Sequence, residues 1–260
     1  MDLHLDGDTA LVTASSAGLG NASARALARE GANVTICGRD ADRLADAKAA
    51  FEGLDGDVLA LEADITDPKD ISAIVEATVE EFGGLDHVVT SAGGPRSGPF
   101  LDMTDQDFYE AYDLLVMSAV WTVKEAYPHL EASDAGSWTA ITSTSVQEAI
   151  DGLVLSNGVR RAVVGIAKTV AREWAPDVRA NVVLPAAHET SRIEELVEQS
   201  LDRGEYDSYE EGLDDWADGI PMGRIGDPDE LGDVVAFLAS DRASFVNGAS
   251  VPVDGGRLRS

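Results

Sequence analysis

Short apolar runs alternate with longer amphipathic segments along almost the whole chain. Each run is four to seven residues long and is followed by a turn or loop residue, which is typical of buried strands. We place strands at residues 10–14, 33–38, 57–63, 85–90, 138–141, 179–184 and 250–253.

The segments between these runs predict helices. Three of them end near residues 30, 51 and 82, and the others cover residues 104–130, 151–174, 190–218 and 228–240. Asp67 is expected as an N-cap, with Pro68 at the first helical position. The alternation predicts an α/β fold with a single doubly wound parallel sheet, covered by helices on both faces. Because no linker or repeat interrupts the pattern, we expect one domain over residues 1–260.

Composition adds an acidic character. The chain has 48 acids against 19 bases, a formal net charge of -29, and the acids are spread along its whole length. A basic partner would explain this charge, but a solvated acidic surface suited to high salt, as in a halophile, explains the even spread better. Such a surface argues against a nucleic-acid partner. The chain has 44% hydrophobic residues but no apolar run long enough to span a bilayer, and it shows no basic leader. It has one cysteine, Cys37, which is typical of a reducing compartment. We therefore expect the protein in the cytoplasm.

Salt should therefore stabilise this protein. Charges that repel one another at low salt are screened over about 3 Å at 1 M salt. We expect the melting temperature to fall as salt is removed, and a melting temperature indifferent to salt would contradict the halophilic interpretation.

The turn after the first strand suggests a phosphate site. Small residues lead there into an alanine-rich helix, so unpaired backbone N–H groups can hold a pyrophosphate. The residues expected to bind the cofactor in this unit are Thr13, Ser15, Ser16, Gly18, Leu19 and Gly20. Ala14 stands where a first glycine is usual, and its methyl group is tolerable if φ stays below zero.

Residues after the next strands extend this site, because ligands of a parallel sheet lie beyond its strand carboxyl ends. Arg39 follows the second strand and can pair with a 2′-phosphate, which favours NADP over NAD, although a solvated arginine is the plainer interpretation. Asp64, with Ile65 beside it, can accept from the adenine amino group or merely shape a turn. Ala92 and Gly93 can lie beside the nicotinamide ribose or form a flexible loop. The same argument adds Pro185 after the sixth strand.

Together these residues resemble the short-chain dehydrogenase/reductase family, especially its 3-oxoacyl-carrier-protein reductase-like branch. Residues 13–20 correspond to the TGxxxGxG turn, Asp64 to the adenine contact and residues 90–93 to NNAG. The run 220–224, with residues 237–241 and 253–256, also matches. The resemblance implies a Rossmann-like fold, a nicotinamide cofactor, a small carbonyl or alcohol substrate, and a tetramer or dimer built on the helices 104–130 and 151–174.

The family uses a Ser, a Tyr, a Lys four residues after the Tyr, and an Asn. Counted back from Gly165, the Lys position is Arg160 and the Tyr position is Ser156. The Ser position is Ser143, with Ser145 as a close competitor, and the Asn position is Leu115. The expected catalytic residues are therefore Ser143, Ser156 and Arg160.

This departure affects the chemistry. A serine hydroxyl is a much weaker acid than a phenol, and arginine cannot relay a proton at neutral pH. Residues 155–160 (LSNGVR) resemble a divergent subgroup with an imperfect tetrad. His188 is an alternative acid, as are Tyr206 and Tyr209 in the segment 188–220 that the family uses as a lid; surface or packing roles are the plainer interpretations. The lid is acidic, which would disfavour an anionic substrate.

Three functions remain open. The first is an NADP-preferring oxidoreductase that acts on a carbonyl or secondary alcohol. The second is a dinucleotide-binding homologue without turnover, such as a sensor or scaffold. The third is a dehydratase or epimerase on the same scaffold. The missing Tyr separates the first two.

Overall fold

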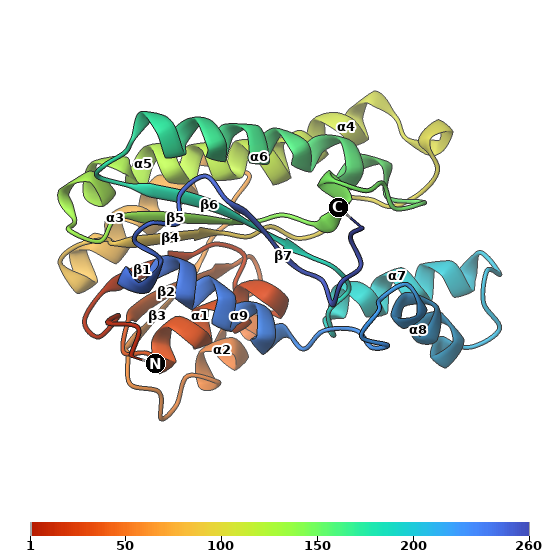
Figure 1. Ribbon diagram of the computed structural model, residues 1–260, viewed down its shortest axis with the longest axis horizontal. Coiled ribbons are helices and arrows are strands. Elements are labelled where there is room, and N and C mark those ends of the chain that lie inside the picture. The colour runs from red at the N-terminus through yellow and green to blue at the C-terminus, as the bar shows by residue number, and fades with distance from the viewer. Residues whose placement is uncertain (1, 260) are drawn as a thin grey trace.

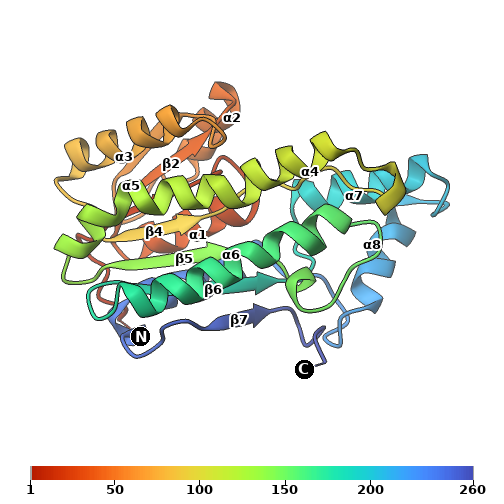
Figure 2. The ribbon, with the colours of Figure 1, turned by 90° about the horizontal axis from the view of Figure 1, so that it is seen from above.

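The computed structural model describes residues 2–259, which form a seven-stranded parallel sheet with helices on both faces (Figure 1, Figure 2). Along the sheet the strand order is β3-β2-β1-β4-β5-β6-β7, and every neighbouring pair is parallel. The strands are β1 (Thr9–Val12), β2 (Asn33–Gly38), β3 (Val58–Glu62), β4 (His87–Thr90), β5 (Ser137–Ile141), β6 (Arg179–Pro185) and β7 (Ser250–Val253). The predicted fold class is confirmed.

Helices form a layer on each side of the sheet. One layer contains α3 (Pro68–Phe82), α5 (Ser118–Ala132) and α6 (Val154–Glu173), and the other contains α1 (Gly18–Arg29), α2 (Ala41–Ala49) and α9 (Pro228–Ala239) (Figure 1). The remaining helices are α4 (Asp105–Tyr112), α7 (Ser191–Asp202) and α8 (Tyr209–Asp218). Figure 2 shows α7 and α8 beyond the carboxyl ends of the strands, which is the edge where ligands of such sheets bind.

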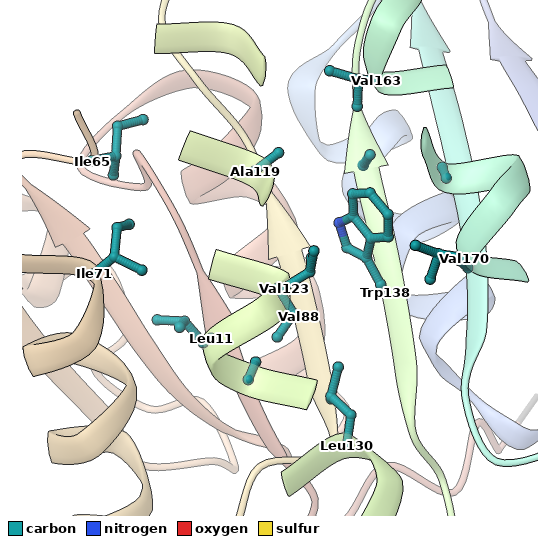
Figure 3. Close-up of a cluster of buried hydrophobic side chains, with 14 of the residues drawn as sticks. Leu11, Ile65, Ile71, Val88, Ala119, Val123, Leu130, Trp138, Val163 and Val170 are labelled. Atoms are coloured by element: carbon teal, nitrogen blue, oxygen red, sulfur yellow. The ribbon is translucent and has the colours of Figure 1, made fainter. Parts of the chain in front are cut away.

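Two hydrophobic cores fill the space between the sheet and these layers. Successive side chains of a strand point to opposite faces, so in β1 Leu11 enters one core while Ala10 and Val12 enter the other. In the first core, Trp138 packs beneath α5 and α6 (Figure 3). Its indole N–H donates to the hydroxyl of Thr90 at 2.9 Å, so the largest side chain of this core has no unpaired polar atom.

Two predicted helices are interrupted. The segment 104–130 begins as α4 after a capping box on Thr104, passes through a π-turn at Asp113–Met117 and continues as α5. The segment 190–218 is two helices, α7 and α8. Gly204 takes a left-handed φ of +71° after α7, and the side chain of Ser208 then caps α8 by accepting the N–H of Glu211. A helical pattern alone does not reveal such breaks. The predicted N-cap at Asp67, with Pro68 after it, is confirmed.

A buried hydrogen-bonded chain joins three strand starts at the opposite edge of the sheet. His87 lies between the Asp8 carboxylate and the Ser137 hydroxyl, with both distances 2.9 Å. His87 and Ser137 are almost fully buried, and neither lines a cavity described for residues 2–259. These hydrogen bonds therefore tie together the starts of β1, β4 and β5.

No helix within residues 2–259 has the length and apolar character needed to cross a membrane. The same residues contain no cluster of three His, Cys, Asp or Glu side chains that could hold a metal ion.

Candidate functional site

A cleft of about 540 Å³ opens beyond the carboxyl ends of the strands, and the segment that contains α7 and α8 forms one of its walls. Its lining includes Ser16 after β1, Arg39 after β2, Ala92 after β4 and Ser143 after β5. All residues predicted to bind the cofactor or to act in catalysis line this cleft, except Thr13 and Ser15. Chain topology thus gathers at one place residues that are far apart in the sequence.

The N-terminus of α1 points its free amides into the cleft. The first turn of a helix lacks intrahelical acceptors for its N–H groups, and the N-cap residue Ala17 has no side chain that could bind them. Gly18, Leu19 and Gly20 line the cleft here, and no acid occupies the first turn. This helix end is suited to an anion such as a pyrophosphate.

The turn before α1 is tightly packed. A Cβ atom at Gly20 would lie 2.6 Å from the carbonyl oxygen of Ala14, so only glycine fits. The expectation that Ala14 keeps its φ below zero is wrong, because its φ is +47°. This left-handed conformation costs about 1–2 kcal/mol for a residue with a Cβ. The backbone on either side imposes it. Thr13 N–H is bound to the Val89 carbonyl and Ser15 N–H to the Cys37 carbonyl.

Thr13 and Ser15 support this turn from outside the cleft lining. The Thr13 hydroxyl donates to the Ser91 carbonyl at 2.7 Å and accepts the Ser91 N–H at 2.9 Å, which ties β1 to the loop after β4. The Ser15 hydroxyl donates to the Val12 carbonyl and accepts the Cys37 N–H, which ties the turn to β2. Their side chains hold the turn before α1 in place.

Two arginines stand at the end of β2. Arg39 is exposed and lines the cleft, as does Arg43 one helical turn further on, in α2. Arg43 was missed in the sequence, although its position in the first turn of the helix that follows β2 could have indicated it. Gly38 leaves no room for a side chain, because a Cβ there would lie 2.7 Å from the Ser16 hydroxyl oxygen. This end of the cleft therefore presents two cations and no acid at position 38.

Asp64 and Ile65 follow β3 at the same end of the cleft. The Asp64 carboxylate accepts from the N–H of Thr66 at 2.9 Å and from its hydroxyl at 2.7 Å. Although burial pushes the pKa of Asp64 upward, these hydrogen bonds and the charge of Arg39 hold it below its ordinary value. Asp64 is thus an anionic acceptor at neutral pH, while Ile65 adds an apolar surface beside it.

Arg160 joins α6 to the loop after β4. Its guanidinium donates to the Gly93 carbonyl at 3.2 Å. Burial, with a smaller contribution from the charge of Arg192, lowers the pKa of Arg160 to about 10. It remains a cation at neutral pH, and its guanidinium lies beside the Gly93 carbonyl. Pro185, the last residue of β6, lines the opposite wall.

The three serines occupy different places. Ser143 follows β5 and lines the cleft, and its hydroxyl oxygen accepts the Ser145 N–H at 3.1 Å. Ser156 also lines the cleft, and its hydroxyl lies 3.2 Å from that of Ser145. Ser145 is fully buried behind the cleft wall. The geometry therefore places Ser143 in the cleft and makes Ser145 the partner of Ser156.

The π-turn lies next to this serine group. It directs Leu114 into the cleft and leaves Leu115, at the predicted Asn position, buried. A second cavity of about 10 Å³, lined by Leu115, Ser118 and Arg160, lies behind the cleft.

The alternative proton donors are poorly placed. His188 lines the cleft, but it is 3% exposed, and its Nδ1 is bound to the Ala186 carbonyl. Burial is the main cause that lowers the pKa of His188, so it is neutral at pH 7. The Tyr206 hydroxyl donates to Asp215, which raises its pKa to about 12. Neither Tyr206 nor Tyr209 is among the cleft-lining residues, whereas Trp216 is.

The charge of the cleft is opposite to that of the protein. Within residues 2–259, six arginines and only two acids line it, in a chain whose formal net charge is -29. The arginines are Arg39, Arg43, Arg96, Arg160, Arg192 and Arg257, and the acids are Asp64 and Glu195. Sequence patterns did not indicate Arg192 or Arg257. The cleft is therefore suited to an anionic ligand.

Comparison with known proteins adds an independent finding. Residues 13–257 match the family described as enoyl-(acyl carrier protein) reductase. The chain is 32% identical to 4-formylbenzenesulfonate dehydrogenase of Comamonas testosteroni, over 98% of this chain and 99% of that protein. It is 34% identical to the oxidoreductase UcpA of Escherichia coli (strain K12), over 97% and 95% of the two chains.

A solved structure has nearly the same shape. The L-sorbose reductase of Gluconobacter frateurii, in complex with NADPH and L-sorbose, superimposes with a TM-score of 0.93 at 30% identity, over 100% of both chains. The match extends over the whole sheet and its helices.

Proposed function

We propose, since the chain belongs to the short-chain dehydrogenase/reductase family of oxidoreductases, that it binds NADP(H) and interconverts a carbonyl and a secondary alcohol. The observation that carries this proposal is the cationic cleft beyond the strand ends of a strongly acidic protein. The relative of nearly the same shape binds NADPH and a sugar carbonyl.

The chain's own residues fit the parts of this dinucleotide. The free amides of residues 18–20 bind the pyrophosphate, and the missing Cβ of Gly20 lets the start of the helix pack against the Ala14 backbone of the preceding turn. Arg39 and Arg43 pair with the 2′-phosphate. On the adenine, Asp64 accepts from the amino group and Ile65 packs against the ring. Ala92, Gly93 and Pro185 lie near the nicotinamide end. Arg160 donates hydrogen bonds to the ribose hydroxyls there.

The serines act on the substrate oxygen. When bound, the cofactor supplies or accepts the hydride. Ser143 and Ser156 both line the cleft, and in this proposal their hydroxyls donate hydrogen bonds to the carbonyl oxygen as negative charge develops on it. Ser145 orients the Ser156 hydroxyl from behind through their 3.2 Å contact. We propose that this degenerate set turns over slowly, because no group in it is an acid of suitable strength.

A specific observation supports the second candidate, a dinucleotide-binding protein without turnover. Among the described residues of the cleft, the titratable group nearest to the required range is His188, which is buried with its Nδ1 already bonded. If the serine hydroxyls do not suffice for catalysis, the protein still binds the cofactor but does not carry out the reaction.

We further propose that residues 1–260 act as one domain in which 188–220 is a lid, and that the surface is adapted to high salt. The eight acids between residues 202 and 218 of the lid are all exposed, as expected of a solvated outer face. They are Asp202, Glu205, Asp207, Glu210, Glu211, Asp214, Asp215 and Asp218.

A cofactor titration at high salt tests the proposed function. We expect NADPH to bind at least about tenfold more tightly than NADH, which corresponds to about 1.4 kcal/mol, because only NADPH carries the phosphate for Arg39 and Arg43. Slow NADPH oxidation should follow with a panel of ketones and aldehydes. Tight binding with no turnover supports the second candidate instead, and the absence of binding contradicts both.

A further inference from the structure

Two cations from different helices meet at the loop after β4. Arg160, from α6, donates to the Gly93 carbonyl at 3.2 Å. Arg192, from α7, donates to the Pro95 carbonyl at 2.9 Å, and a Cβ placed on Gly94 would lie 2.2 Å from its Nε. Both guanidinium groups line the cleft, and they are close enough for the charge of Arg192 to lower the pKa of Arg160 further than burial alone.

These charges are incompletely neutralised by the protein. Arg192 forms one ion pair, with Glu195 at 3.1 Å, and that carboxylate is 57% exposed. Within residues 2–259, no carboxylate lies within ion-pairing distance of Arg160 or of Arg257, whose guanidinium lies 6.0 Å from the Trp216 ring centroid. Holding like charges together in a partly desolvated cleft is unfavourable unless an anion joins them.

Apolar side chains also line the cleft. Leu114 from the π-turn, Ile150 and Leu153 before α6, and Trp216 from α8 line the same cleft. An apolar wall with a cation at its edge binds a molecule that has an apolar body and a charged end.

We propose that the cleft selects carbonyl substrates with an apolar body and an anionic end group, such as a carboxylate or sulfonate, and that Arg192 binds this group. The assignment rests on the proposed function and names the substrate class for the same site. The acidic lid would disfavour an anion, but of its acids only Glu195 lines the cleft, where the arginines outnumber the acids, and Arg192 from the same segment is one of these arginines. A guanidinium offers parallel N–H donors that match such an end group.

Matched probes test the assignment. The ketone 4-acetylbenzoate and its neutral analogue 4-acetylbenzamide have nearly the same shape, and neither can be oxidised by NADP⁺. Calorimetric titration into the NADP⁺-loaded full chain at fixed salt should show that the carboxylate binds about tenfold to a hundredfold more tightly. Arg192→Met should abolish this preference and leave the affinity for the amide within about twofold.

Arg203→Met is the matched control. It removes the same charge from the end of α7, but Arg203 pairs with Glu205 and does not line the cleft. Its preference for the carboxylate should equal that of the wild type.

Three results overturn the assignment. The first is that the wild type binds the two probes with equal affinity, and the second is that it does not bind the carboxylate at millimolar concentration. The third is that Arg192→Met loses so much affinity for NADP⁺ that this loss explains the weaker binding of the probe. The last would assign Arg192 to the cofactor phosphates. Because binding is measured without hydride transfer, the preference can hold in a protein that shows no turnover. In that case the proposed function fails and the anion site stands.

Discussion

The double variant Ser156→Tyr with Arg160→Lys is expected to reduce ketones at least about a hundredfold faster than the wild type, which is the lower end of what a positioned general acid contributes. Ser156 and Arg160 are four residues apart on α6 and both line the cleft, so the new phenol and ammonium lie on one helix face. The nearby ammonium lowers the phenol pKa toward neutrality, which a serine hydroxyl cannot reach.

The single variants show which group is missing. Ser156→Tyr alone should gain much less, because the Arg160 guanidinium stays with the Gly93 carbonyl and is not built to relay a proton. Arg160→Lys alone should gain nothing, since the acid is still absent. Initial rates of NADPH consumption at saturating ketone, with melting temperatures to confirm folding, give the comparison.

Arg161→Lys, combined with the wild-type Ser156, controls for a change of cation on the same helix. Arg161 is exposed and does not line the cleft, so its rate should stay at the wild-type value. A double variant no faster than the wild type would show that the wild-type site already has an acid, or that the cleft does not position a ketone for reaction.

Most of the fold could be predicted because the strands are short, apolar and buried on both faces. The adjacent side chains of Leu11 and Val12 pack into the two cores on opposite faces of the sheet. An unbroken run of apolar residues predicts such a strand, buried on both faces. The cofactor side of the cleft followed from topology, since Arg39, Asp64 and Gly93 each come within three residues of a strand's carboxyl end. Because the carboxyl ends of parallel strands lie at one edge of the sheet, residues that follow different strands can be predicted to lie near one another without any knowledge of side-chain contacts.

Other features depend on contacts between distant segments and could not be predicted. The left-handed φ of Ala14 arises because its neighbours are bound to β2 and β4. Thr13 and Ser15 resemble cofactor ligands in the sequence, but their hydroxyls are used by Ser91 and Cys37. The partnership of Ser145 with Ser156 is likewise a tertiary contact, made across eleven residues.

The substrate side was the least predictable part. The acidic lid suggested that an anionic substrate is disfavoured, whereas the charge that a ligand meets depends on which side chains of the lid line the cleft. Arg192 lies in the same acidic segment as Asp202 and Glu205, yet it faces the cleft while these two are exposed. Local electrostatics in a desolvated cleft outweigh distant surface charges that salt screens.

Removing both arginines at the end of β2 is the second large-effect change. We expect Arg39→Ser with Arg43→Ser to weaken NADPH binding about a hundredfold or more, since each charge-assisted hydrogen bond contributes about 1.5–3 kcal/mol. NADH binding should change little, because NADH places hydroxyls rather than a phosphate there. Fluorescence titration of both cofactors at the same high salt gives the two affinities.

Arg29→Ser is the control for lost positive charge. Arg29 pairs with Asp233 and does not line the cleft, so both cofactors should bind as they do to the wild type. Equal weakening of NADPH and NADH in the double variant would mean that the arginines act on adenine or on folding and would contradict their role at the 2′-phosphate.

A gain of NADH binding requires an acid at position 39, because a side chain at Gly38 would collide with Ser16. Arg39→Asp with Arg43→Ser should therefore reverse the preference, whereas Gly38→Asp should weaken both cofactors.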